Sequence, residues 1–108
     1  MYNAILQAVH SVIVPNEQFA LVAPVGTAIQ NARTSILGDR LTRDGYHLNL
    51  EYGRYIAGLT FFSAITGVDV SNVNYVAPGI PADIKVVCIE AAVNAVKNPF
   101  IVTPAATR

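Results

Sequence analysis

The sequence predicts an α/β fold that is mostly helical and holds one strand buried on both faces, the type found in parallel sheets. Apolar residues make up 53% of the 108 positions, which suits a chain buried on several sides or one that lacks a partner surface. Four segments carry the apolar spacing of helices, and a continuous apolar run lies between the first two. This helix–strand–helix order is typical of layered α/β folds, and the length allows one domain or a part of one.

The first helix and the strand occupy the N-terminal part of the chain. Residues 4–14 repeat apolar side chains at helical spacing, after Asn3 as an N-cap and before Pro15 as a stop. The run at residues 19–23 has the length and flanks of a buried strand. A strand needs neighbours for its backbone hydrogen bonds, yet no second parallel strand precedes it, and the alternating residues 68–76 look peripheral. We therefore expect an incomplete fold.

A second helix is predicted over residues 27–37, where Gly38 stops it. It follows the strand, at the edge where open α/β sheets place their ligands. Gln30, Asn31 and Arg33 could therefore face a site, although an ordinary solvated helix position is the favoured interpretation of each one.

The clearest helix pattern covers residues 50–66, with Asn49 as its N-cap. Gly53 and Gly58 cost helix propensity inside it, which indicates close packing against another backbone. A last helix is predicted over residues 81–97 because a proline suits the first helical position. The tail beyond it is expected to be loose or to pair as a short strand.

Between the second and third helices lies a turn with an aspartate three residues before a histidine. Residues i and i+3 of a β-turn have Cα atoms within about 7 Å of each other, and Gly45 permits a tight turn. Asp44 can then accept a hydrogen bond from one ring nitrogen of His47, which leaves the other nitrogen free as a base near neutral pH. The alternative is a surface loop whose aspartate only caps the chain.

Three strings around this turn resemble a known family: PVGTAIQNART at residues 24–34, TRDGYHLN at residues 42–49 and GRY at residues 53–55. Together they resemble the C-terminal part of the SGNH hydrolases, the GDSL-type esterases and lipases, and are most similar to a bacterial branch known only as a domain of unknown function. The resemblance implies the C-terminal part of a three-layer α/β/α, flavodoxin-like domain over residues 1–75. Residues 76–108 would add a helix and tail that pack on it.

The same resemblance implies that Asp44 and His47 are the acid and base of a Ser-His-Asp triad. The implied reaction is hydrolysis of a carboxylic ester, with acetyl groups on carbohydrates as one substrate class and with no metal or organic cofactor. A serine in a glycine-flanked strand-to-helix turn is missing from the chain, and only Ser35 among its serines merits a test. We therefore expect the C-terminal half of a longer enzyme, inactive alone, whose serine lies on a missing N-terminal half.

Two other hypotheses stay open. The chain could be a binding or assembly module without catalysis, whose apolar faces are covered by a partner or by self-association. It could also be a metal-dependent hydrolase that uses Asp39, Asp44 and His47, although this set offers few ligands.

Composition excludes several other classes. The formal net charge is zero, so the basic footprint of a nucleic-acid-binding protein is absent. No apolar run reaches the roughly 18 residues of a membrane span. The first three residues lack the basic region of a signal peptide, which leaves the compartment unassigned and export of a longer parent enzyme open. The single cysteine, Cys88, permits no internal disulfide and is predicted to be buried and inert.

Overall fold

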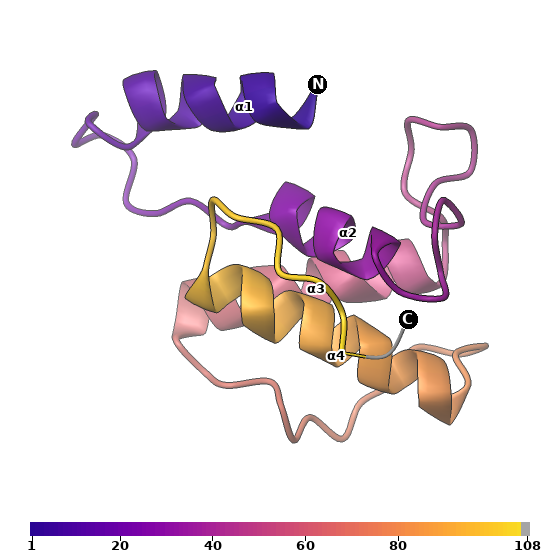
Figure 1. Ribbon diagram of the computed structural model, residues 1–108. Coiled ribbons are helices and arrows are strands. Elements are labelled where there is room, and N and C mark those ends of the chain that lie inside the picture. Colours follow the sequence, from indigo (N-terminus) through magenta and orange to yellow (C-terminus); the bar gives the residue numbers. More distant parts are fainter. Residues whose placement is uncertain (107–108) are drawn as a thin grey trace.

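A computed structural model describes residues 1–106, and its ordered elements are helices (Figure 1). They are α1 (Tyr2–Ala8), its π-helical continuation η1 (Val9–Ile13), α2 (Val25–Arg33), α3 (Tyr52–Thr66) and α4 (Ala82–Lys97). In Figure 1, α2, α3 and α4 form a packed body, and α1 lies apart from it at the top of the view. Within the described part of the chain, no helix combines the length and apolar character that crossing a bilayer requires.

The core lies where α2, α3 and α4 meet, since each of these helices contacts the other two. Small side chains let α2 and α4 approach closely: Ala28, Ala32, Ala92 and Ala95 are fully buried. Larger apolar side chains from all three helices and the connecting segments fill the remaining space: Ile29, Leu37, Leu41, Tyr55, Ile56, Leu59, Val70, Ile84, Val87 and Cys88. The predicted burial of the lone cysteine is therefore confirmed.

The third predicted helix is present, although α3 begins at Tyr52 rather than at residue 50. The N-cap is Glu51 and not the predicted Asn49, although the Asn49 Oδ1 accepts a hydrogen bond of 2.6 Å from the Gly53 N–H in the first turn. Close backbone packing is confirmed at Gly53, where an added Cβ would stand 2.8 Å from the Leu41 carbonyl oxygen. At Gly58 the same expectation is wrong, because nothing lies within 4 Å of an added Cβ.

The predicted α/β class, with a buried parallel-type strand at residues 19–23, is wrong. Within residues 1–106 there is no sheet, and the β-type pairing is limited to an isolated bridge between Thr42 and Leu48. Residues 19–23 have no regular structure, and the side chains of Phe19 and Leu21 are 51% and 46% exposed. A strand exists only where neighbours accept and donate its backbone hydrogen bonds, and within residues 1–106 no β-type pairing joins this segment to another one.

The N-terminal helix is placed differently from the prediction. It begins at Tyr2, and its apolar stripe is covered only in part: Leu6, Val9 and Ile13 are half-buried and Ile5 and Val12 are exposed, so that neither α1 nor η1 contains a buried residue. Two contacts tether it to the body. The hydroxyls of Tyr2 and Thr27 lie 2.8 Å apart, and the rings of His10 and Phe100 have centroids 4.0 Å apart.

The C-terminal tail is held along α2, which corrects the expectation of a loose or strand-forming segment. Asn31 is 1% exposed; its Oδ1 accepts a 2.7 Å hydrogen bond from the Thr103 N–H, and its Nδ2 donates to the Ala91 carbonyl of α4 at 3.2 Å. The Thr27 hydroxyl donates to the Pro99 carbonyl at 2.6 Å. The Asn31 side chain therefore joins three segments and neither faces solvent nor faces a site.

Candidate active site

The Asp-His turn projects from the body between α2 and α3 as a short closed loop. Backbone hydrogen bonds join its two sides, from Arg43 N–H to the His47 carbonyl at 2.8 Å and from Asn49 N–H to the Leu41 carbonyl at 2.9 Å. Gly45 turns the chain at φ +85°, a conformation that favours glycine. The loop is thus fixed by its own backbone and by its attachment to the start of α3.

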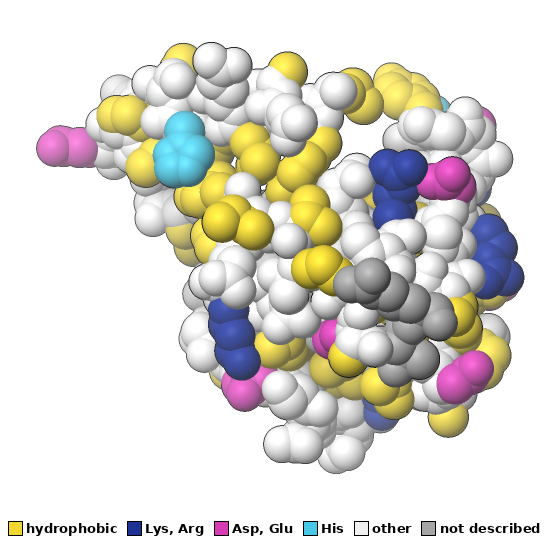
Figure 2. All heavy atoms as spheres, in the orientation of Figure 1, with side chains coloured by type: hydrophobic (Ala, Val, Ile, Leu, Met, Phe, Trp, Pro, Cys, Tyr) yellow, Lys and Arg dark blue, Asp and Glu magenta, His cyan; other side chains and the backbone are white. Residues whose placement is uncertain are grey.

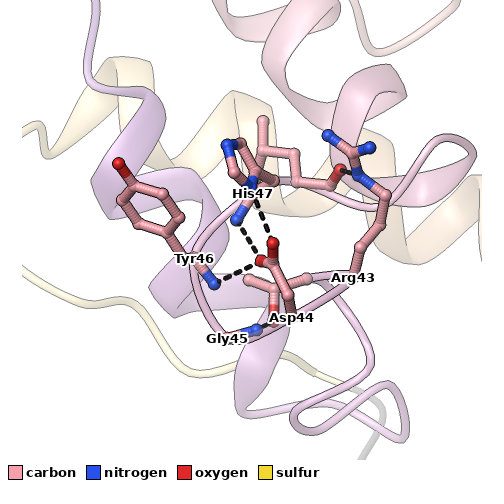
Figure 3. Close-up of polar contacts among 7 residues, drawn as sticks. Arg43, Asp44, Gly45, Tyr46 and His47 are labelled. Atoms are coloured by element: carbon pink, nitrogen blue, oxygen red, sulfur yellow. Dashed lines mark hydrogen bonds and ion pairs between the residues drawn. The ribbon is translucent and has the colours of Figure 1, made fainter.

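The Asp44 carboxylate binds the histidine at both its ring and its backbone (Figure 3). The Nδ1 of His47 lies 2.6 Å from Oδ2, while Oδ1 accepts the backbone N–H groups of His47 at 2.7 Å and Tyr46 at 3.0 Å. The hydrogen bond from the His47 ring, followed by those from the two N–H groups and the charge of Arg43, lowers the pKa of Asp44 below its ordinary value. Asp44 is therefore a carboxylate at neutral pH.

This contact assigns the protonation of the imidazole. A carboxylate can only accept, so Nδ1 carries the proton and, in the neutral ring, Nε2 is the acceptor. The His47 and Asp44 side chains are 55% and 50% exposed, which leaves the ring open to a reaction partner. The Tyr46 ring meets the imidazole edge-on with centroids 4.4 Å apart, and the Arg43 Nε donates to the Leu48 carbonyl at 3.0 Å. Neither the ring contact of Tyr46 nor the hydrogen bond of Arg43 is indicated by the sequence pattern.

A hollow of about 1000 Å³ lies beside the carboxylate, and we call it the α1 hollow. Its lining comes from the α1 segment, α2 and residues 39–48, and it includes Ile5, Val25, Ile29, Leu41, Asp44 and Tyr46. A second hollow, of about 530 Å³, lies along α3 and the segment after it, and no residue of the Asp-His turn lines it. Asp44 thus borders the larger of these two spaces, whereas the His47 ring that it binds lines neither of them.

Ser35 is not placed to act as the nucleophile. It is buried, and its hydroxyl donates to the Ala32 carbonyl at 2.6 Å and accepts the Leu37 N–H at 3.1 Å. Such local bonds compete with helix continuation and explain why α2 ends at Arg33 instead of near residue 37. Of the remaining serines, Ser11 and Ser63 lie within helices, and Ser71 Oγ donates to Asp69 at 2.6 Å.

The metal-site hypothesis is not supported by the placement of its residues. Asp39 forms an ion pair with Arg33, with 2.6 Å between Oδ1 and Nη2, and Gln30 binds the same guanidinium at 3.0 Å. Across residues 1–106, no three histidine, cysteine or acidic side chains gather as metal ligands would. Asp39 therefore belongs to a surface ion pair and does not join Asp44 and His47.

Two comparisons place this architecture among known proteins. The model of a family described as a domain of unknown function, DUF4886, matches residues 1–95. The crystal structure of a DUF4886 family protein from Bacteroides uniformis ATCC 8492 is similar to this chain with a TM-score of 0.88 and 43% identity. The similarity covers 94% of this chain and 39% of that one, so this chain spans about two fifths of that protein's length. No curated protein matches the chain.

Proposed function

We propose that this chain, which belongs to the DUF4886 family, supplies the Asp-His pair of a Ser-His-Asp triad in an SGNH-type carboxylic ester hydrolase. The observation that carries the proposal is the 2.6 Å contact between His47 Nδ1 and Asp44 Oδ2. Two features support it further: the carboxylate keeps its charge at neutral pH because its pKa is lowered, and the ring is half exposed.

The proposed chemistry follows from the free Nε2 of His47. This nitrogen takes the proton of a serine hydroxyl as the serine oxygen attacks the ester carbonyl, and it then returns the proton to the leaving alcohol. A water molecule, deprotonated by the same nitrogen, attacks the acyl-serine, and the nitrogen then gives that proton to the serine oxygen as the acid is released. Asp44 holds the ring in the required tautomer and stabilises the imidazolium that forms in each half-reaction. Acetyl esters of carbohydrates are the substrate class that the SGNH resemblance suggests.

The nucleophile and oxyanion hole are proposed to lie outside this chain. The four serines offer no hydroxyl at His47, and the chain spans only about two fifths of its Bacteroides relative. We infer that the rest of a full-length family member carries the serine. On its own, this chain is expected to give no hydrolysis of p-nitrophenyl acetate above a His47→Ala control.

A covalent chimera tests the proposal without relying on assembly of separate pieces. This chain replaces the matched 39% of the Bacteroides protein, a graft made practical by the 43% identity and the TM-score of 0.88. The chimera should hydrolyse p-nitrophenyl acetate and react with a serine-directed fluorophosphonate. His47→Ala should lower the hydrolysis rate by about 10²–10⁴-fold, and Asp44→Ala should lower it strongly as well.

Matched controls separate catalysis from folding. His10→Phe removes the chain's other histidine while keeping a ring against Phe100, and Asp83→Asn removes an exposed carboxylate in the first turn of α4. Both variants should keep the activity of the parent chimera. A folded chimera that neither hydrolyses the ester nor reacts with the fluorophosphonate would show the proposal to be wrong. Hydrolysis that survives His47→Ala would do the same.

A further inference from the structure

Several apolar side chains of α1 and of the segment that follows it are left exposed by the rest of the described chain. Ile5 is 52% exposed, and Val12, Val14 and Phe19 in the following segment are also exposed. Figure 2 shows hydrophobic side chains in the seam between the α1 layer at the top and the helical body below it. Exposed apolar side chains that gather in one region of a soluble protein are typical of interaction surfaces.

The α1 hollow lies between the α1 segment and the helical body, and both sides contribute apolar side chains to its lining. Met1 and Ile5 of the α1 segment line it on one side, and Ile29, Leu41 and Leu48 of the body line it on the other. Its volume of about 1000 Å³ is at the upper limit for small-molecule pockets. A space of this size between two apolar walls suits a segment of polypeptide better than a small ligand.

We propose that the α1 hollow is the seat of a polypeptide segment from the unmatched part of the family protein, the segment that presents the nucleophilic serine. The inference rests on the proposed function. Two observations point to this occupant: about three fifths of the Bacteroides relative lies outside the match, and the hollow opens beside Asp44 and Tyr46. An apolar segment packed between α1 and α2 would therefore emerge beside Asp44, the carboxylate that binds the His47 ring at 2.6 Å.

The occupant also has a defined chemistry. It presents apolar side chains to Ile5, Ile29 and Leu41, and a hydroxyl at the end of the hollow that Asp44 lines. Arg33 and Asp39 are part of the same lining but are already paired with each other. Arg43 also lines the hollow, where its Nε donates to the Leu48 carbonyl at 3.0 Å, so the segment is expected to carry no positive charge.

Cysteine labelling measures whether the hollow is filled, independently of catalysis. Ile5→Cys places a thiol in the hollow, and Ile65→Cys places one on α3 at a position 64% exposed that lines neither hollow. The native thiol of Cys88 is buried and contributes little background. In the isolated chain, both introduced thiols should react rapidly with a maleimide, because both positions are exposed.

In the chimera with the Bacteroides protein, the thiol from Ile5→Cys should react at least about tenfold more slowly, while that from Ile65→Cys keeps its rate. An unchanged rate at position 5 would overturn the inference. The inference would also be overturned if the thiol at position 5 were already protected in the isolated chain and sedimentation showed a dimer, since a second copy would then fill the hollow. Protection in a chimera without ester hydrolysis would refute the proposed function alone, and an active chimera with position 5 unprotected would refute the docking site alone.

Discussion

Substitution of Gly53 by alanine tests how the Asp-His turn is anchored. Gly53 lies in the first turn of α3, and an added Cβ would stand 2.8 Å from the Leu41 carbonyl oxygen and 3.2 Å from both the Asn49 Oδ1 and the Leu48 Cβ. Carbon–oxygen contacts in proteins are normally about 3.3 Å or longer. The Leu41 carbonyl would therefore have to move by about half an ångström, and this carbonyl also accepts the Asn49 N–H that closes the turn.

The change in unfolding free energy follows from two destabilising effects and one stabilising effect. Overpacking against a fixed neighbour costs about 1–3 kcal/mol, and weakening of the Asn49 N–H bond to Leu41 adds up to about 1 kcal/mol. Alanine in place of glycine in a helix returns at most about 1 kcal/mol. Gly53→Ala should thus destabilise the fold by about 1–3 kcal/mol. Gly58→Ala, on the same helix with open space around it, should instead stabilise it by about 0.5–1 kcal/mol.

Thermal and urea unfolding followed by circular dichroism would measure the difference. The resulting separation of about 1.5–4 kcal/mol between the two variants corresponds to roughly 6–16 °C in Tm for a chain of this size. Amide NMR shifts at Gly45 and His47 should move in Gly53→Ala and stay in place in Gly58→Ala. Equal stability of the two variants would refute the argument that close backbone approach at Gly53 positions the turn.

Three other predictions concern the buried Asn31 side chain, the contact between Asp44 and His47, and Cys88. Asn31→Ala should cost about 2 kcal/mol of unfolding free energy in urea titration because it removes two buried hydrogen bonds, whereas Gln30→Ala on the surface should change it by less than about 0.5 kcal/mol. Because the pKa of Asp44 is lowered in the folded protein, this carboxylate stabilises the fold fully above its ordinary pKa near 4, and the stabilisation is lost as the pH falls through the lower folded pKa. His47→Ala should raise the pKa of Asp44 in a carboxyl NMR titration. An unchanged pKa would contradict the assignment of the His47 ring as its main cause. Burial raises the pKa of Cys88 to about 12, so iodoacetamide at pH 8 should modify it only after unfolding, as read by mass spectrometry.

The parts of the fold that the sequence predicted well are determined by nearby residues. α3 ends at Gly67 in the left-handed conformation, and α4 begins directly after Pro81, because both boundaries are local signals. The contact between Asp44 and His47 was also anticipated, since it joins residues three apart. Its catalytic role stays a proposal.

The remaining features depend on residues far apart in sequence. The strand at residues 19–23 was inferred from apolar character, but a strand is defined by partners that no local pattern can supply. Asn31 and Thr103 are 72 residues apart, and nothing near either one indicates that they bind each other. Ser35 was a reasonable candidate by distance along the chain alone, whereas its hydroxyl is consumed in ending α2.

The hydroxyl of Thr27 fastens both ends of the molecule at one point. Having a single proton, which it gives to the Pro99 carbonyl, it must receive the proton of the Tyr2 hydroxyl at its lone pair. The N-terminal helix and the C-terminal tail are thus joined by two consecutive hydrogen bonds, in which Tyr2 donates to Thr27 and Thr27 donates to Pro99. Thr27→Val, which keeps the shape and deletes the hydroxyl, should loosen the amino-terminal helix and the carboxy-terminal tail together, and hydrogen exchange would register the two segments opening in the same variant.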